Sequence, residues 1–536
     1  MVPPSRAGGA GVPAHPPAPR VAPRGRPRAT PGGRARAAPG GRPGTAPGGR
    51  FRTAPGPPGE EARPVPGGRA RNPGDDPDGE HPHHEPENAE NRDHRRHVLP
   101  PCCPLRRPPA APVPSLQRDC PVRRAPKARL SKTRASAQDD AMTPKPAPSG
   151  RPLLAPRLAS FGTTVFAEMS ALAARTGAIN LGQGFPDTDG PDEVREAAVR
   201  ALREGRGNQY PPGPGIPELR EAVAAHQHRF HGIDLDPGTE VLVTAGATEA
   251  IAATLLALVE PGDEVIAFEP YYDSYAAGIA LAGGHRVPLT LRAPGFRPDL
   301  DRLAALITPR TRLLLLNSPH NPTGMVLTRE EATEIARLAV AHDLLVVTDE
   351  VYEHLVHEGE HIPLATLPGM RERTVSISSA GKTFSFTGWK VGWVTGSAAL
   401  VTAVRTVKQY LTFVSAGPFQ YAVAEALALP DAYFTAFRED LRRKRDLLCE
   451  GLAEAGFTVH RPQGTYFVTT DITPLGLGDD GTKFCLALPE RCGVVAVPNA
   501  VFYDDPEAGR PLVRFAFCKR EGVLEEAVTR LKRLAV

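Results

Sequence analysis

The segment SISSAGKTFSFTGWKVGW, residues 376–393, carries the side chains best suited to chemistry. Lys382 follows a strand-like run through small residues, and small residues let the backbone come close to a ligand. Apolar and cationic neighbours lower the pKa of a lysine, so that its neutral amine can form an imine with an aldehyde. Ser379 and Lys390 can bind a phosphate dianion, one through its hydroxyl and the other through its charge. The segment therefore predicts a reactive amine beside a phosphate site.

A second ionisable group ends an apolar run. Asp349 closes LLVVTDE, and Tyr352 follows it three residues later. A carboxylate at the end of a buried strand is costly unless it is paired or functional. Held against a pyridine nitrogen, Asp349 would keep that nitrogen protonated and make the ring an electron sink. The alternative is that Asp349 caps the N-terminus of a helix.

Two turns that follow other apolar runs add candidates for ligand binding. Gly246, Ala247 and Thr248 open a helix whose backbone N–H groups and dipole could hold a phosphate, although a glycine in such a turn often has no ligand. Tyr272 follows the run EVIAFEP, where its ring could stack on a planar heterocycle or pack as an ordinary core residue.

An amide and a guanidinium complete the set of candidates. Asn321 lies in NSPHNPTG, a composition typical of a turn, and its amide could also donate a hydrogen bond to a phenolate-like oxygen. Arg514 lies inside the apolar run LVRFAFCK. Its forked donors fit a substrate carboxylate, and an ion pair within the protein is the alternative.

Six short runs that are apolar on both faces predict the strands of a parallel sheet. They are residues 240–245, 264–270, 312–317, 344–350, 374–379 and 392–396. Helical patterns lie between them, such as residues 328–342, where Thr328 and Glu331 have the spacing of a capping box. Alternating strands and helices predict a large, doubly wound and mostly parallel α/β domain, in which ligands lie at the carboxyl ends of the strands. The candidates between Gly246 and Lys390 fall at those ends, so we expect them to meet in one site.

The end of the chain has a different pattern. Residues 431–456 read as one long charged helix, followed by the strand-like runs TYFVTTDI and LVRFAFCK and a closing helix at residues 524–534. This order predicts a smaller α+β domain, completed by the segment around residues 158–190. The expected division is an extension at residues 1–150, an N-terminal arm at 151–190, the large domain at 191–425 and the small domain at 426–536.

The first part of the chain is dominated by proline, glycine, arginine and alanine, from Met1 to about residue 138. It has too few large apolar side chains to offset the entropy of ordering, so we expect an extension that is disordered and without a role, rather than one that binds nucleic acid or membranes. Met142 stands shortly before ordinary globular sequence, and we expect translation to start near it; a native product that begins at Met1, seen by intact-mass measurement, would contradict this.

The sequence also limits the compartment. No secretory signal and no apolar run of transmembrane length are found in the 536 residues. The seven cysteines are odd in number, and those of the later part show no CxxC spacing, so neither a disulfide framework nor a cysteine-based metal site is indicated. We expect a cytoplasmic protein.

Taken together and in their order along the chain, the segments NSPHNPTG, DEVY, SISSAGKTFS and TGWKVGW resemble the class I aminotransferases of fold type I, which use pyridoxal-5'-phosphate (PLP). The resemblance extends from about residue 158 to the end of the chain. It is strongest to the kynurenine/methionine branch, through INLGQGFPD and NQYPPGPG. NQYPPGPG and EPYYDSY are also similar to actinobacterial enzymes described as probable N-succinyldiaminopimelate aminotransferases.

The resemblance implies a role for each candidate. Lys382 would hold the cofactor aldehyde and then move the proton of the substrate. Asp349 would pair with the ring nitrogen, Tyr272 would stack on the ring, and Asn321 and Tyr352 would hydrogen-bond its 3'-oxygen. The amides of Ala247 and Thr248, with Ser379 and Lys390, would hold the phosphate. Tyr210 would reach the phosphate of a neighbouring subunit, which implies a homodimer with shared sites. Arg514 would bind the substrate α-carboxylate, aided by the backbone near Gly184.

Two positions depart from the usual pattern. Many class I aminotransferases have arginine where this chain has Lys390, although the kynurenine branch also uses lysine. Phe166 falls about where that branch often carries a tryptophan against the substrate side chain, which puts a preference for aromatic substrates in doubt.

The implied reaction moves an amino group from an amino acid to a 2-oxo acid such as 2-oxoglutarate, with N-succinyldiaminopimelate as the expected donor in diaminopimelate and lysine biosynthesis. A kynurenine/methionine-type enzyme with β-elimination activity on cysteine conjugates is the alternative. A non-catalytic regulator with this fold is a remote one, because residues 1–150 contain no helix-turn-helix pattern.

Overall fold

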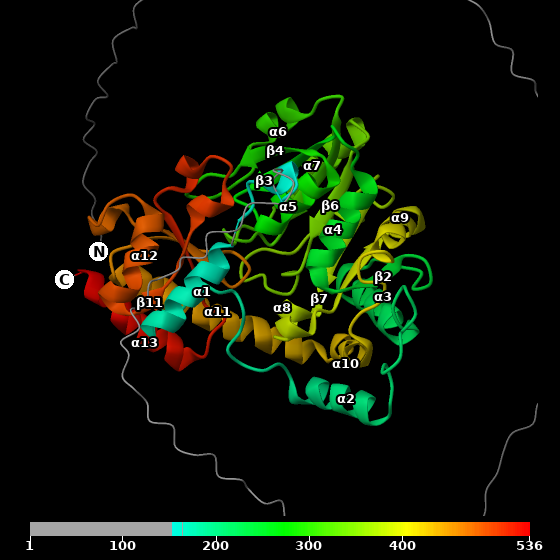
Figure 1. Ribbon diagram of the computed structural model, residues 1–536, viewed down its shortest axis with the longest axis horizontal. Coiled ribbons are helices and arrows are strands. Elements are labelled where there is room, and N and C mark those ends of the chain that lie inside the picture. Colours follow the sequence, from blue (N-terminus) through cyan, green and yellow to red (C-terminus); the bar gives the residue numbers. More distant parts are fainter. Residues whose placement is uncertain (1–152, 163, 536) are drawn as a thin grey trace, which may run out of the picture. The chain divides into compact units, whose positions relative to one another are not determined.

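The computed structural model describes residues 153–162 and 164–535 (Figure 1). The expectations of a disordered extension and of a start near Met142 concern residues outside this part of the chain. Among the helices of residues 153–535, none combines the length and the apolar character that crossing a membrane requires.

The largest sheet has seven strands in the order β2-β8-β7-β6-β5-β3-β4. These strands are β2 (Val241–Thr244), β3 (Glu264–Glu269), β4 (His285–Thr290), β5 (Thr311–Asn317), β6 (Leu345–Asp349), β7 (Thr374–Ser379) and β8 (Gly392–Gly396). Neighbours from β7 to β4 run parallel, and only β8 is antiparallel to its two neighbours in this sheet. The predicted mostly parallel sheet is confirmed, and each of the six predicted strands is present to within one residue at either end.

The seventh strand, β4, was not predicted from the sequence. Its residues HRVPLT are mostly half-buried, and Pro288 interrupts the pattern. The strand pairs only with β3 at the edge of the sheet, where a residue without a backbone donor is tolerated. Because β4 lies at the edge of the sheet, its sequence is not apolar on both faces as that of a central strand is.

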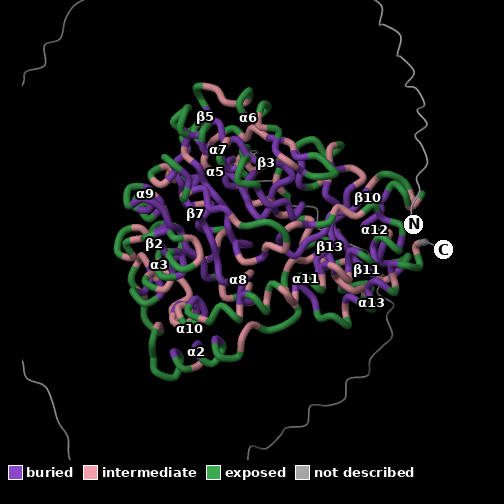
Figure 2. Tube along the Cα trace, turned by 180° about the vertical axis from the view of Figure 1, so that it is seen from behind, coloured by how far each residue is buried: buried purple, intermediate pink, exposed green. Residues whose placement is uncertain are grey.

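Helices cover both faces of the sheet. On one face, Leu313 and Leu315 of β5 pack in a core with α4 (Gly246–Leu258), α5 (Asp273–Ala282) and α9 (Ala398–Lys408). On the other face, Leu314 and Leu316 pack with α6 (Leu300–Leu306) and α7 (Arg329–Ala341). Alternate residues of β5 thus belong to two different cores, and this explains why the strand is apolar on both faces. Figure 2 shows the strands of this sheet as buried. The capping box of Thr328 and Glu331 at the start of α7 is also confirmed.

A further group of helices flanks β2. It contains α2 (Asp192–Arg203), α3 (Pro217–His231) and α10 (Gly417–Leu427), and α10 packs against both of the others. A separate core of small and branched apolar side chains joins them to Val241 and Val243 of β2.

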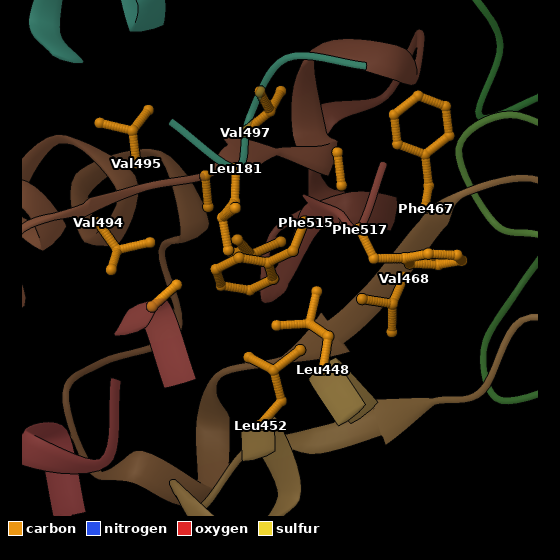
Figure 3. Packing of buried hydrophobic residues seen from close by; sticks show 14 of the residues in the cluster. Leu181, Leu448, Leu452, Phe467, Val468, Val494, Val495, Val497, Phe515 and Phe517 are labelled. Atoms are coloured by element: carbon orange, nitrogen blue, oxygen red, sulfur yellow. The ribbon is translucent and has the colours of Figure 1, made fainter. Parts of the chain in front are cut away.

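The C-terminal lobe contains an antiparallel sheet of four strands in the order β12-β13-β10-β9. Its strands are β9 (Thr458–His460), β10 (Phe467–Asp471), β12 (Val497–Pro498) and β13 (Leu512–Ala516), and its helices are α11 (Asp431–Glu454), α12 (Gly481–Cys492) and α13 (Glu521–Leu531). Leu448 and Leu452 of α11 meet Val468 and Phe515 of the sheet in a core with no exposed member (Figure 3). The predicted small α+β unit is therefore present.

The segment before residue 190 packs onto this lobe. Helix α1 (Val165–Thr176) lies against α12, and β1 (Ile179–Asn180) pairs in parallel with β11 (Val494–Val495). Leu181, which is fully buried, lies in the core drawn in Figure 3. The boundaries at residues 150, 190 and 425 stay predictions.

Candidate active site

One cavity gathers nine of the residues singled out from the sequence. They are Ala247, Thr248, Tyr272, Asn321, Asp349, Tyr352, Ser379, Lys382 and Lys390. The empty space of the cavity, which includes its opening to solvent, is about 740 Å³. The residues come from the segments that directly follow β2, β3, β5, β6 and β7, so the carboxyl ends of these strands meet at one place, as the sequence predicted.

One end of the cavity is suited to an anion. Helix α4 begins there, and no side chain of its N-cap residue Ala245 caps the helix. The backbone N–H groups of its first turn, among them those of Ala247 and Thr248, are left to point at a ligand. Ser379, at the end of β7, and Lys390 line the same part of the wall. Helix dipole, hydroxyl and ammonium thus all favour negative charge at this end.

Two glycines let these elements come close together. Gly246 has φ +71°, a conformation that L side chains rarely adopt, and the position of a Cβ on it would lie 3.4 Å from Lys390 Nζ. A Cβ on Gly392 would lie 2.7 Å from the carbonyl carbon of Gly246 and 2.9 Å from the nitrogen of Ala247. Strand β8 can therefore approach the start of α4 only because residue 392 has no side chain.

Asp349 lies at the floor of the cavity and is buried. Tyr275 Oη donates a hydrogen bond of 2.6 Å to its Oδ2, and the backbone N–H of Val351 donates one of 3.3 Å to its Oδ1. Burial raises the pKa of Asp349 to about 6, against the lowering effect of these two donors. The residues that follow form turns, so Asp349 is not the N-cap of a helix and that alternative was wrong.

Two asparagines join Asp349 to a guanidinium. Asn317 donates from Nδ2 to the carbonyl oxygen of Asp349 over 2.7 Å and accepts the backbone N–H of Asn321 on its Oδ1 over 2.7 Å. Asn321 Oδ1 in turn accepts from Nη1 of Arg514 over 2.8 Å. Because its oxygen is used in this way, the NH₂ group of Asn321 is the end left to donate into the cavity.

Arg514, on β13, is only 1 % exposed. Its second recorded partner is the carbonyl oxygen of Gly182, at 3.1 Å from Nη2, and its Nε has no partner among the described residues. Both recorded partners are neutral, so the alternative of an ion pair is not what the structure shows. Burial lowers the pKa of Arg514 to about 10. A buried cation held only by neutral groups is costly, and an anionic ligand would compensate it.

Aromatic rings surround this guanidinium. Its Cζ lies 4.0 Å from the ring centre of Phe467, 5.1 Å from that of Phe502 and 5.3 Å from that of Phe166. Phe166 therefore lies beside the candidate carboxylate site. This agrees with the resemblance to the kynurenine branch, which often carries a tryptophan against the substrate side chain at about this position.

Lys382 lies in the short helix α8 (Ala380–Thr383), directly after β7. Burial lowers the pKa of its amine, although the nearby Cys518 and Asp349 raise it. Its Nζ is 5.9 Å from the ring centres of both Tyr352 and Tyr466. Burial also raises the pKa of the Tyr352 hydroxyl, which keeps it a hydrogen-bond donor at neutral pH.

Three predicted residues do not line the cavity. Arg514 is joined to its wall through Asn321, and the other two are Tyr210 and Gly184. Tyr210 is 82 % exposed and meets only the edge of the Phe413 ring, with 5.7 Å between ring centres, among the described contacts of its ring. Gly184 lies near Arg514 in the chain segment that supplies Gly182, and its carbonyl oxygen accepts from Tyr466 Oη over 2.7 Å. The roles assigned to Tyr210 and Gly184 stay predictions.

Sequence reasoning missed Tyr275 and Asn317, which hold Asp349, and Tyr466, which faces Lys382. A signal existed for Tyr275, because it follows Tyr272 by three residues at the start of α5 and so shares its side of the helix. The contact of Tyr466 with Lys382 joins segments that are far apart in the chain, so no local sequence pattern predicts it.

The comparisons with known proteins agree with this arrangement. The family model described as aminotransferase class I and II matches residues 176–531, which include every residue that lines the cavity. A probable N-succinyldiaminopimelate aminotransferase of Mycobacterium tuberculosis is 56% identical over 391 residues, which are 71% of this chain and 98% of that protein. The methionine aminotransferase of Escherichia coli is 42% identical over 379 residues, 70% of this chain and 97% of that protein. The solved structure of the N-succinyldiaminopimelate aminotransferase from Mycobacterium tuberculosis covers 71% of this chain and 100% of its own, with a TM-score of 0.70.

The close approach of β8 to α4 can be tested with two glycines of one segment. Gly392→Ala would place a methyl group against the backbone of Gly246 and Ala247 and should lower the free energy of unfolding by about 1–3 kcal/mol. Gly388→Ala is the control, because a Cβ there meets nothing within 4 Å, and it should change the value by less than about 0.5 kcal/mol. Urea unfolding of the two variants measures both effects. Equal stability of the two variants would contradict the described contact.

Proposed function

Because the chain belongs to the aminotransferase class I and II family, we propose that it is a PLP-dependent aminotransferase that works with the residues of the cavity described above. The observation that carries the proposal is the pairing of Lys382 and Asp349 in one buried cavity. Burial lowers the pKa of the first and raises that of the second. An aldehyde cofactor with a basic ring nitrogen requires two groups. One is an amine that readily loses its proton, and the other is a carboxylate without a cationic partner in the protein.

The residues present fit PLP at both of its ends. When bound, PLP supplies an aldehyde that condenses with amines and a ring that withdraws electrons. Asp349 would hold the ring nitrogen, with Tyr275 fixing the carboxylate from behind. The uncapped start of α4, with Ser379 and Lys390, would hold the phosphate. Gly392 lets β8 pack closely against the start of α4, and Lys390 lies beside Gly246 at this end.

The faces and edge of the ring also have partners. Tyr272 lines the cavity where a ring could stack, and Asn321 and Tyr352 would donate hydrogen bonds to the 3'-oxygen. The orientation of Asn321 supports this role, because Arg514 already occupies its oxygen and leaves its NH₂ group for the cofactor.

Lys382 would be the group that moves the proton. Once an amino-acid substrate has displaced its amine, that amine can accept a proton from the substrate Cα, because its pKa is lowered by burial. The same amine would also give the proton back, so Lys382 would act as base and then as acid. An amino acid and a 2-oxo acid would use this pocket in turn.

Arg514 would bind the α-carboxylate of either substrate. Its fork has an unpartnered Nε and two neutral partners, so a carboxylate would neutralise a charge that the protein leaves uncompensated. The link through Asn321 and Asn317 to Asp349 would then set the substrate carboxylate at a fixed position relative to the ring.

For the substrate, we propose N-succinyldiaminopimelate as donor and 2-oxoglutarate as acceptor. The support is the identity of 56% to the Mycobacterium tuberculosis protein of that description, which the chain covers almost completely. Methionine and kynurenine are the alternative donors, because aminotransferases described for them match as well, at 42% and 37% identity. Phe166 is consistent with a pocket that is not specialised for aromatic donors.

We further propose that the enzyme acts as a homodimer with shared sites. Tyr210 is 82 % exposed, and Tyr410, Leu411 and Phe413 are exposed large side chains as well. Covering such groups by a second copy would remove apolar surface from water and would bring Tyr210 to the phosphate of the other subunit. The four cysteines of the described residues are free and buried, which supports the expected cytoplasmic location.

A panel of donors tests the substrate. With 2-oxoglutarate as acceptor, kcat/KM for N-succinyldiaminopimelate should exceed that for methionine and for kynurenine by at least about tenfold, a difference of ~1.4 kcal/mol in transition-state binding. Lys382→Ala, as the control, should be inactive with every donor. A preference for methionine or kynurenine would overturn the substrate and leave the class intact. Pyruvate released from a cysteine conjugate without any oxo acid would instead favour the β-elimination alternative.

The hydrogen bond from Tyr275 to Asp349 predicts a change in pH dependence. The phenol O–H favours the ionised carboxylate, so Tyr275→Phe should raise the pKa of Asp349 above that of the wild type. The acid limb of kcat/KM should therefore move to higher pH by about one unit, with activity recovered in alkaline solution. Tyr503→Phe is the control, since that buried hydroxyl donates to the carbonyl oxygen of Leu291. An acid limb that is the same in Tyr275→Phe and wild type would contradict the role of Tyr275.

A further inference from the structure

A cluster of imidazole and carboxylate groups lies outside the catalytic cavity. His226 and His231 come from α3, and Glu353 and His354 come from the turn that follows β6. None of these residues lines the cavity that contains Lys382. The family reaction described above uses none of them.

Three of these side chains converge on one point. One ligand atom each of His226, Glu353 and His354 lies within 4.8 Å of the other two, and within residues 153–535 no other group of this kind occurs. The Nε2 atoms of His226 and His354 are 2.7 Å apart. His226 and Glu353 are buried, whereas His354 is partly exposed and so leaves a route from solvent.

The three side chains offer suitable ligand atoms for a cation, namely two imidazole nitrogens and one carboxylate oxygen.

Further residues orient the candidate ligands. Glu353 Oε2 accepts from His231 Nε2 over 2.8 Å, and Glu353 Oε1 accepts from Ser378 Oγ over 2.6 Å. Phe230 lies against the ring of His226 and Phe434 against that of His354, with ring centres 4.8 Å and 4.5 Å apart. Carboxylates that bind metal ions are usually held by such outer hydrogen bonds.

From this arrangement we infer that His226, Glu353 and His354 form a site for one divalent transition-metal ion, with zinc as the best match. Two imidazoles and one carboxylate are a ligand set that zinc accepts, with water in the fourth position, whereas calcium and magnesium require oxygen ligands. Zinc bonds of about 2.0–2.1 Å in tetrahedral geometry place ligand atoms about 3.3 Å apart. To bind the ion, the two Nε2 atoms would separate from their 2.7 Å distance and the carboxylate oxygen would move inward.

The ion would tie helix α3 to the elements that carry the catalytic residues. Glu353 follows Tyr352 directly, and Ser378, which holds Glu353, precedes Ser379. An ion at this point would brace the ends of β6 and β7 from outside the cavity, so its expected effect is on stability and its effect on kcat is small. Without the ion, a single N–H···N hydrogen bond between His226 and His354 would hold the two rings, and this is the arrangement that the experiment must exclude.

The test uses the full-length holoenzyme, stripped of metal with a chelator and then given zinc chloride. After gel filtration, zinc per chain is counted, and the thermal midpoint is recorded with and without zinc. The chain before residue 150 contains its own histidines, at positions 15, 81, 83, 84, 94 and 97. The count is therefore taken as the difference between the wild type and His226→Phe in the same full-length chain. His228→Phe is the matched control, because His228 lies on the same helix with its side chain 69% exposed.

The wild type and His228→Phe should bind one zinc ion per chain more than His226→Phe, and zinc should raise their thermal midpoint by at least about 2 °C. X-ray absorption of zinc on the wild type should show two imidazole ligands, a readout that remains if His226→Phe fails to fold. An equal zinc count in all three proteins, no shift of the midpoint, or zinc without imidazole ligands would each overturn the site.

Discussion

The site depends on taking one amine and one carboxylate out of water in the same cavity. Burial shifts their pKa values in opposite directions, down for Lys382 and up for Asp349, so that the charged form of each costs more than it would in water. The sheet makes this arrangement possible, because β6 and β7 are neighbours in parallel register and end side by side. Asp349 ends the first strand, and Lys382 follows the second by three residues.

The remaining cationic groups form two ends suited to anions, one in the cavity wall and one beside the cavity. At one end, α4 begins without a side-chain cap beside Lys390, and at the other, Arg514 is buried among aromatic rings with neutral partners. Positive charge without an internal counterion at both ends matches a cofactor that carries a phosphate and a substrate that carries a carboxylate. The chain of Asn317 and Asn321 joins Asp349 to Arg514 and sets the relation between the two ends.

Much of this arrangement could be predicted from the sequence, because its main signals are local. Buried parallel strands are apolar on both faces, and residues that follow such strands must meet at one edge of the sheet, which placed Ala247, Asp349 and Lys382 together. Contacts between distant segments could not be predicted in this way. Tyr275 reaches Asp349 across 74 positions of the chain, and β4 lacks the apolar signal because it lies at the edge. The cluster of His226 and His354, 128 positions apart, left no trace in local spacing either.

The central claim is that the amine of Lys382 is the attachment point of an aldehyde cofactor, and borohydride reduction tests it most directly. Protein incubated with PLP is reduced, digested and mapped by mass spectrometry, with Lys382→Ala treated in parallel. The account predicts that the cofactor stays covalently attached to one peptide, the one that contains Lys382, and that the variant shows no such peptide. Attachment at another lysine, or none in the wild type, would contradict it.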